Sequence, residues 1–186
     1  MAHNKYTISI IALLMLFLFP SFQANAQTDI SFEFQAYPTG LIPGLRVEKG
    51  FGDKNAVHLR LGANLFDHRD LGVQDEEKGN GFGFSIGYKR YLKNDHQGWS
   101  LGIKNDIWFN SVDWVDNIVG DISQTGTTKI VVVQPTVELG YLVEFGNNWV
   151  FTPAIAFGYE VNVKTEGAPT GEGPILLLGL SIGKRL

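Results

Sequence analysis

The chain has 186 residues, with 15 basic and 19 acidic side chains and a formal net charge of −4. This mild acidity, without any basic tract, argues against a nucleic-acid partner. The chain contains no cysteine, which excludes disulfides, thiol catalysis and anchoring through a lipidated cysteine.

Residues 1–26 have the three parts of a secretory signal peptide. Lys5 precedes an apolar run at residues 8–19, and residues 24–26 read Ala-Asn-Ala, an A-x-A cleavage site. The run is short for a membrane-spanning helix, which needs about 20 apolar residues, so an N-terminal anchor is the less favoured interpretation. We therefore expect Sec-type export and a mature chain, residues 27–186, that forms one domain.

Eight segments of the mature chain alternate between apolar side chains and small, polar or charged ones. Such a period of two predicts β-strands, because successive side chains of a strand point to opposite faces. The clearest example is residues 57–65, where Val57, Leu59 and Leu61 alternate with His58 and Arg60. The predicted strands are residues 30–37, 44–51, 57–65, 82–89, 99–104, 128–145, 149–163 and 174–186. The fifth of these continues beyond residue 104 with looser alternation.

The hairpin at residues 136–163 has two amphipathic arms joined by Gly146-Asn147-Asn148, a turn typical of β-hairpins. Each arm is long enough to cross a bilayer, which requires about 9–11 tilted strand residues. Pro135 and Pro153 each remove a donor from a ladder, so bulges are expected there. Asn105 falls on the apolar face unless a bulge shifts the register.

The connections between the predicted strands alternate in length. Short turns follow the second, fourth and sixth strands, and longer loops follow the third, fifth and seventh, at residues 67–79, 111–127 and 164–173. The loop after the first strand, residues 38–43, is intermediate. This arrangement is typical of bacterial outer-membrane barrels, which have periplasmic turns, external loops and both termini in the periplasm. No second apolar run approaches the length of a spanning helix, so a membrane location requires a closed barrel.

The volume of the apolar face decides which face lies outside. A soluble barrel such as a lipocalin would turn this face inward, but the face carries many Phe, Trp and Tyr side chains, and an eight-stranded barrel has a narrow interior. Glycines such as Gly62, Gly83 and Gly87 share the opposite face and suit a crowded lumen. The expected fold class is therefore all-β: an eight-stranded antiparallel up-and-down transmembrane β-barrel with its apolar face toward lipid.

The inward face carries a nearly balanced set of charges, as buried charges must if each is to find a partner. We expect a lumen network of Glu33, Arg46, Glu48, His58, Arg60, Lys89, Lys104, Asp106, Glu138, Glu144, Glu160 and Arg185. Outward aromatic residues beside the short turns form a predicted interfacial girdle of Phe51, Trp99, Phe145 and Trp149.

With its export signal, eight alternating strands, asymmetric loops and apolar last strand (Leu178, Leu180, Ile182), the chain resembles the small eight-stranded outer-membrane β-barrel proteins of Gram-negative bacteria. The resemblance covers the whole mature chain but rests on architecture, and the chain ends in Leu186 where such strands usually end in an aromatic residue. It implies an outer-membrane location, contact with membrane lipid and lipopolysaccharide, insertion by the barrel-assembly machinery, and a monomer.

The leading functional prediction is a non-enzymatic outer-membrane protein, structural or interacting through its external loops, with its lumen plugged and no cofactor. One alternative is an enzyme that modifies lipid A, as a deacylase or acyltransferase. The His-x-Ser pattern of the deacylases is absent at His58 and His68, whereas His68, Asp70 and Ser111 match the acyltransferases in composition only. A second alternative is a binder of a small apolar ligand.

Several loop acids are candidates for cation ligands. Asp113, Asp116 and Asp121, and the run at residues 75–77, lack the spacing of a Ca²⁺ loop, so solvated loops without metal are expected. The partly apolar loop that follows Asp113 is a candidate for contact with a partner or the outer leaflet, or for a cap over the barrel.

Overall fold

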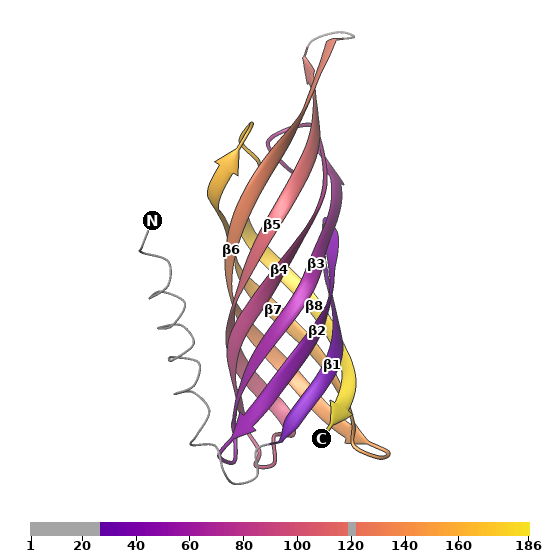
Figure 1. Ribbon diagram of the computed structural model, residues 1–186, viewed down its shortest axis with the longest axis vertical. Coiled ribbons are helices and arrows are strands. Elements are labelled where there is room, and N and C mark those ends of the chain that lie inside the picture. Colours follow the sequence, from indigo (N-terminus) through magenta and orange to yellow (C-terminus); the bar gives the residue numbers. More distant parts are fainter. Residues whose placement is uncertain (1–26, 119–121) are drawn as a thin grey trace, which may run out of the picture.

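The computed structural model describes residues 27–118 and 122–186. Eight strands, each antiparallel to the next, close into a barrel through pairing of β8 with β1 (Figure 1). The all-β, eight-stranded up-and-down barrel predicted from the sequence is confirmed. The predicted signal peptide lies outside the described residues. The strands are β1 Thr28–Tyr37, β2 Gly40–Phe51, β3 Asn55–Arg69, β4 Glu76–Tyr91, β5 Gly98–Ile118, β6 Ile122–Phe145, β7 Trp149–Glu166 and β8 Gly173–Arg185.

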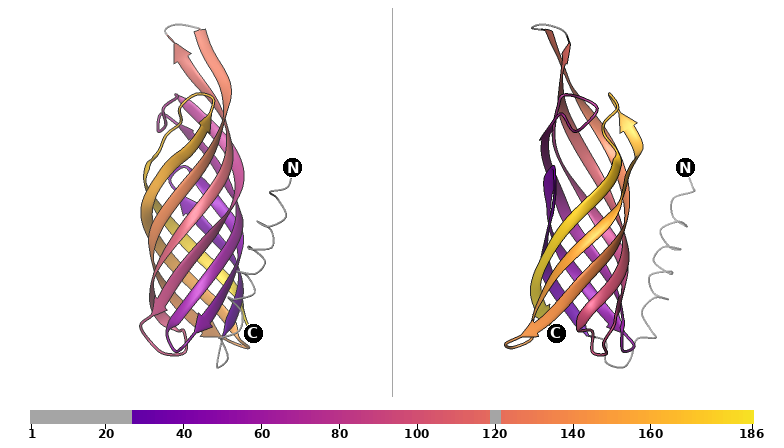
Figure 2. Two further views of the ribbon diagram at one scale, coloured as in Figure 1. Left: turned by 60° about the vertical axis from the view of Figure 1, so that its left-hand side comes forward. Right: turned by 180° about the vertical axis from the view of Figure 1, so that it is seen from behind.

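The two ends of the barrel differ. At one end, here called the turn end, lie the turns at residues 52–54, 92–97 and 146–148, together with the start of β1 and the end of β8 (Figures 1 and 2). Gly146 and Asn148 both have positive φ angles, 56° and 59°, which glycine and asparagine tolerate best. The opposite end, the loop end, carries residues 38–39, 70–75 and 167–172. Within the described chain no helix is long and apolar enough to cross a membrane.

The strands at the loop end are longer than the sequence predicts. Residues 67–69 pair with residues 76–78, so the predicted loop at 67–79 shrinks to 70–75. Strand β5 continues to Ile118 and β6 starts at Ile122, which replaces most of the predicted loop at 111–127 with a two-stranded hairpin. Likewise Pro43 lies inside β2, paired with Phe34. The segments at 67–69 and 111–118 were missed because they lack an apolar outward face, since Asp67, Arg69 and Asp113 are exposed there.

The expected bulges at the prolines are absent. On the β6–β7 ladder the register is the same on both sides of Pro135 and Pro153, although pairs beside each proline are missing. The missing N–H therefore costs local pairing without a slip, because a one-residue slip would turn every apolar side chain of the strand to the wrong face. The register of this ladder shifts instead between residues 131 and 132. Asn105 stays in register opposite Pro135, on the outward face.

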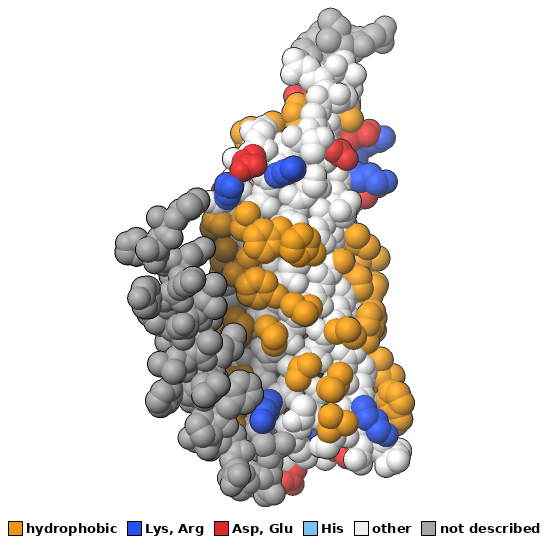
Figure 3. Space-filling model, in the orientation of Figure 1, with side chains coloured by type: hydrophobic (Ala, Val, Ile, Leu, Met, Phe, Trp, Pro, Cys, Tyr) orange, Lys and Arg blue, Asp and Glu red, His pale blue; other side chains and the backbone are white. Residues whose placement is uncertain are grey.

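The alternating faces separate apolar from charged side chains around the whole barrel. Leu61 and Phe82 are 62% and 69% exposed, whereas Arg60, the neighbour of Leu61, is 1% exposed. Figure 3 shows the outward apolar side chains as a belt across the middle of the barrel, with charged side chains above and below it. An uncovered belt of this kind is unusual on a protein surrounded by water and indicates an apolar environment.

The interior leaves no room for larger side chains at two glycines next to it. A Cβ atom at Gly83 would collide with the carbonyl oxygen of Ile107 and the ring of Trp108, and one at Gly87 would collide with the ring of His58. Glycine is required at both positions because inward side chains of neighbouring strands already fill the space.

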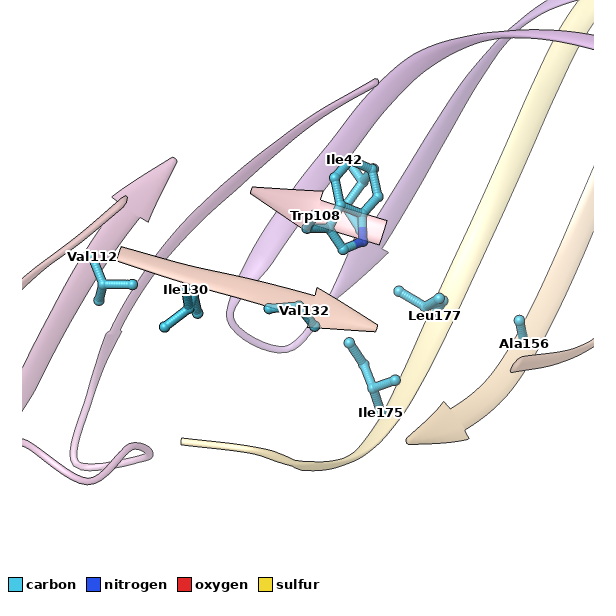
Figure 4. Packing of buried hydrophobic residues seen from close by; sticks show 8 residues of the cluster. All are labelled: Ile42, Trp108, Val112, Ile130, Val132, Ala156, Ile175 and Leu177. Carbon is cyan, nitrogen blue, oxygen red and sulfur yellow. The ribbon is translucent and has the colours of Figure 1, made fainter. Parts of the chain in front are cut away.

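The part of the interior nearer the loop end is apolar, which was not predicted from the sequence. Figure 4 shows eight buried side chains, contributed by β2, β5, β6, β7 and β8, that form one cluster. We call this cluster the apolar layer: Ile42, Trp108, Val112, Ile130, Val132, Ala156, Ile175 and Leu177. The barrel interior is therefore divided into a polar part and an apolar part.

Candidate functional site

Arg60 on β3 is the most connected charge of the interior. Its Nη1 donates to Glu33 Oε1 at 2.7 Å, its Nη2 donates to Asp106 Oδ1 at 2.7 Å, and its Nε donates to Ser85 Oγ at 3.0 Å. The guanidinium also lies 5.5 Å from the ring centre of Trp108. A planar guanidinium with fixed donors suits such multiple contacts better than a lysine ammonium does. Arg60 thus joins the polar interior to the apolar layer.

The contacts of Arg60 are part of a closed ring of charges. Arg46 contacts Glu33 at 2.7 Å and Glu48 at 3.9 Å. Lys89 joins Glu48 to Glu138 at 3.2 Å on each side, and Lys104 joins Glu138 at 3.9 Å to Asp106 at 3.6 Å. Four cations and four carboxylates therefore alternate without a break. The members of this ion-pair ring, in order, are Arg46, Glu33, Arg60, Asp106, Lys104, Glu138, Lys89 and Glu48.

The ring draws its members from β1 to β6, and all of them are buried. Strand β8 supplies Ser181, whose hydroxyl accepts a hydrogen bond from Arg46 at 3.1 Å. Tyr91 donates its hydroxyl proton to Glu48. With four cations and four carboxylates, the ring as a whole is neutral. Each charge has partners of opposite sign on both sides, and this pairing offsets the cost of removing the side chains from water.

The other four residues of the predicted lumen network lie outside the ring. His58 is buried beside it, and its Nδ1 has no hydrogen-bond partner among the described residues. Arg185 and Glu144 meet at the turn end at 2.8 Å. Arg185 also forms a bidentate contact with the carboxylate of Asp29. Asp29 was not predicted as a lumen residue because it precedes the predicted start of the first strand. Glu160 lies alone near the loop end.

The predicted girdle residues lie on the outward face beside the turns. Trp99 packs edge to face on Tyr141, with ring centres 5.0 Å apart, and the Nζ of Lys184 lies 5.4 Å from the ring centre of Trp149. Phe145 is 45% exposed. The remaining residue, Phe51, lies 6.3 Å from Tyr88 and is half-buried. This placement suits side chains that sit at the boundary between lipid and water.

A cavity of about 590 Å³ opens at the loop end, above the apolar layer. Its lining includes Val112, Ile130 and Ile175 of that layer, together with Tyr37, Asn64 and Asn110 from the inward faces of β1, β3 and β5. This cavity cannot be read from the sequence, because its residues come from seven strands and three connecting segments that only the closed barrel brings together.

Two loops contact each other over this cavity. The Nε2 of Gln74 in the β3–β4 loop donates to the carbonyl of Pro169 in the β7–β8 loop at 2.7 Å. Glu77 holds the first loop by accepting hydrogen bonds from the backbone N–H groups of Val73 and Gln74. Asn162 holds the second loop through its side-chain amide, which donates to the carbonyls of residues 170 and 171. The loop end is therefore partly covered by ordered loops.

The charged lining of the cavity is mainly acidic. Glu77, Glu160 and Glu172 lie on it, whereas neither lysine nor arginine does. The imidazole of His68 lies 3.5 Å from Glu77. Asn110 is 5% exposed, and its Oδ1 has no hydrogen-bond partner among the described residues. The cavity thus combines an apolar floor with acceptor groups on its walls.

The residues considered for lipid A chemistry are not brought together. His68 lines the cavity on the inward side, while Ser111 lines a groove on the outward side beside Phe82 and Phe109. Alternate side chains of a strand point to opposite sides of the sheet, so the barrel wall lies between His68 and Ser111. A serine on one face cannot pass its proton to a histidine on the other.

The loop acids make other contacts. Asp113 accepts a hydrogen bond from the hydroxyl of Thr127 at 2.7 Å, and Asp75 accepts one from the backbone N–H of Asn117 at 2.8 Å. Within the described chain no three His, Asp or Glu side chains are placed to hold a metal ion. Asp121 lies outside the described residues.

No protein-family model matches the chain, and no curated protein matches it. Among solved structures, the chain is similar to Ail, the attachment invasion locus protein of Yersinia pestis, in complex with the heparin analogue sucrose octasulfate. The TM-score is 0.50 and the identity 10%, over 88% of this chain and 100% of that chain.

The chain is also similar to the N-terminal β-barrel domain of Pseudomonas aeruginosa OprF, with a TM-score of 0.46 and 15% identity over 86% of this chain and 97% of that chain. For Neisserial surface protein A the values are 0.47 and 8%, over 87% and 96%. The likeness to Ail concerns the fold alone, and this chain has the fold of the eight-stranded outer-membrane β-barrels.

Proposed function

We propose that this protein is a non-enzymatic integral protein of the bacterial outer membrane, with a closed lumen and an external hairpin that contacts other molecules. The observation that carries this proposal is the separation of faces, with an apolar belt outside and paired charges inside. A chain that folds in this way needs an apolar surrounding for its outer face. The girdle residues and the signal peptide predicted for residues 1–26 agree with this location.

The ion-pair ring supports a closed lumen. Its eight buried side chains contact one another across the interior of a barrel that is narrow at eight strands. The apolar layer lies above the ring and adds a second barrier to water and ions. We therefore expect that the refolded protein does not conduct ions across a planar lipid bilayer, and a steady open channel would contradict the plug.

The β5–β6 hairpin supports contact outside the membrane. Figure 2 shows these strands running beyond the other strands at the loop end. Trp114 stiffens the hairpin, since its Nε1 donates to Thr128 Oγ1 at 3.1 Å and its ring leaves no room for a Cβ atom at Gly126. Its described side chains include the exposed Asp113, Ser123 and Gln124. A stiff projection that exposes polar side chains at its surface suits recognition more than it suits a cap.

A cysteine-labelling experiment tests location and orientation together, because the natural chain has no cysteine. Ser123→Cys places a thiol on the hairpin, and Asp53→Cys places one in a turn at the other end; both positions are exposed. In intact cells a membrane-impermeant maleimide should label Ser123→Cys only. Asp53→Cys should react once the outer membrane is opened. The reverse pattern, or equal labelling of both, would overturn the proposed orientation.

The enzymatic alternative has a separate test. Mass spectrometry of lipid A from cells with and without the gene should show the same acyl pattern. A changed pattern that is abolished by His68→Ala would overturn the non-enzymatic proposal.

A further inference from the structure

We propose that the cavity at the loop end binds a small organic cation, with an ammonium group attached to an apolar body. This inference goes beyond the proposed function, since the cavity belongs to the folded barrel and requires no particular role in the membrane. It rests on the size of the cavity, on two unpaired acceptor groups and on the apolar floor.

The cavity has the dimensions of a ligand site. Its volume of about 590 Å³ lies within the range of about 300–1,000 Å³ usual for small-molecule pockets. Below it, Trp108 and the rest of the apolar layer block the way toward the turn end. The contact between Gln74 and Pro169 holds the two loops above it together. A molecule that enters from the loop end therefore meets a closed floor and ordered walls.

Glu160 is the first acceptor that lacks a partner. Of the three carboxylates on the wall, Glu77 already accepts two backbone N–H groups and lies beside His68. Glu172 accepts the backbone N–H of Asn162 at 2.9 Å. Glu160 has neither an ion pair nor a hydrogen bond with any described residue, although it is half-buried. A shielded carboxylate without a counter-charge is costly, and a bound ammonium group would relieve that cost.

Asn110 is the second such acceptor. Its side chain belongs to β5, is 5% exposed and lines the same cavity, and its Oδ1 is without a partner in the described part of the chain. Buried amide oxygens are nearly always hydrogen-bonded in folded proteins. An ammonium group has several protons to donate and can serve Asn110 and a carboxylate together.

Other ligand classes fit less well. A metal ion would need a group of at least three close ligands, and the described residues contain none. An anion would meet three carboxylates and no lysine or arginine on the wall. A wholly apolar ligand would pack against Val112, Ile130 and Ile175, but it would leave Glu160 and Asn110 unpaired. An amine on an aromatic or aliphatic body satisfies both parts.

The test is calorimetric titration of the mature chain, refolded in uncharged detergent, with 2-phenylethylamine. Two probes of similar shape serve as comparisons, the neutral 2-phenylethanol and the anionic 3-phenylpropionate. We expect saturable binding of the amine, at least tenfold weaker binding of the alcohol and no binding of the acid. Equal affinity for all three probes, or no saturable binding of the amine, would overturn the inference.

Substitutions locate the site. Glu160→Gln should weaken binding of the amine at least tenfold. Glu172→Gln lies in the β7–β8 loop and keeps a side-chain oxygen that can accept the N–H of Asn162; it should weaken binding severalfold and serves if Glu160→Gln fails to fold. The matched control is Glu166→Gln, because Glu166 is exposed and already paired with Lys164 at 2.7 Å; it should leave binding unchanged. Full binding by folded Glu160→Gln and Glu172→Gln proteins would contradict the site.

A gel-mobility control separates this inference from the proposed function. Folded outer-membrane barrels migrate differently before and after boiling, so each variant is first tested for this shift. A protein that shifts but binds no amine overturns the ligand site alone, whereas a protein that never shifts counts against the membrane barrel.

Discussion

The ion-pair ring and the cavity at the loop end lie in the same barrel but treat buried charge in opposite ways. In the ring every carboxylate contacts two cations; Glu33, for example, contacts Arg46 and Arg60. On the cavity wall Glu160 contacts none among the described residues. Paired charges hold a structure closed, whereas an unpaired acceptor in a pocket is available to a ligand. We therefore propose that the barrel is closed at its centre and open to a ligand at its loop end.

The largest expected effect is the loss of Arg60. Arg60→Met removes one 2.7 Å contact from Asp106 and one from Glu33, and removing one member of a buried ion pair costs about 3–5 kcal/mol. Urea titration of the refolded barrel, followed by gel mobility, measures this loss. The control is Lys78→Met at the exposed Lys78–Asp67 pair, where about 0–1 kcal/mol is expected. Equal losses of unfolding free energy in the two variants would show that the buried ring is no more important for stability than the exposed Lys78–Asp67 pair.

A somewhat smaller effect is expected one residue further along the same strand. Leu61 points outward, so Leu61→Arg should cost about 2–4 kcal/mol if the residue lies near the middle of the bilayer. Leu71→Arg, on a loop and 69% exposed, is the matched control and should be neutral. Urea unfolding in lipid vesicles compares the two variants. If Leu61→Arg were neutral and the crowded Gly62→Leu were neutral as well, the inward and outward faces would be wrongly assigned.

The smallest effect concerns the loops above the cavity. Gln74→Ala removes the hydrogen bond to Pro169, which is worth about 0.5–1.5 kcal/mol. Because the loops can open without unfolding the barrel, the urea midpoint should stay constant while amide hydrogen exchange in residues 70–75 and 167–172 becomes faster. Unchanged exchange would show that this contact does not hold the mouth together.

Sequence reasoning found the strands best where one face is apolar. Residues 57–65 and 149–163 were placed correctly because lipid on one side and a crowded interior on the other require strict alternation. The strands at the loop end were missed, because the outward face of residues 67–69 and 111–118 carries polar side chains such as Asp67 and Asp113 in place of apolar ones. Sequence reasoning also overestimated what Pro135 and Pro153 do, since the flanking alternation fixes the register across each proline.

The interior could be predicted only in part. Arg46, Arg60 and Lys89 occupy the alternate strand positions that face inward, and charge balance required carboxylate partners for them. Which carboxylate meets which cation depended on the stagger of neighbouring strands, which no single strand encodes. Trp108 was overlooked because it follows Asn105, where the alternation loosens, although its even position gives it the same inward face as Lys104 and Asp106.

The number of strands, the face that each side chain takes and the segregation of charge from apolar surface all follow from the amino-acid sequence. These properties are local, because they follow from the geometry of one extended strand and from the character of alternate residues. The folded barrel was needed to show that eight charges close into a ring, that an apolar layer lies between them and the loop end, and that Glu160 and Asn110 share one cavity. These properties depend on the register between strands and on the curvature of the closed barrel, which bring together residues far apart in the chain.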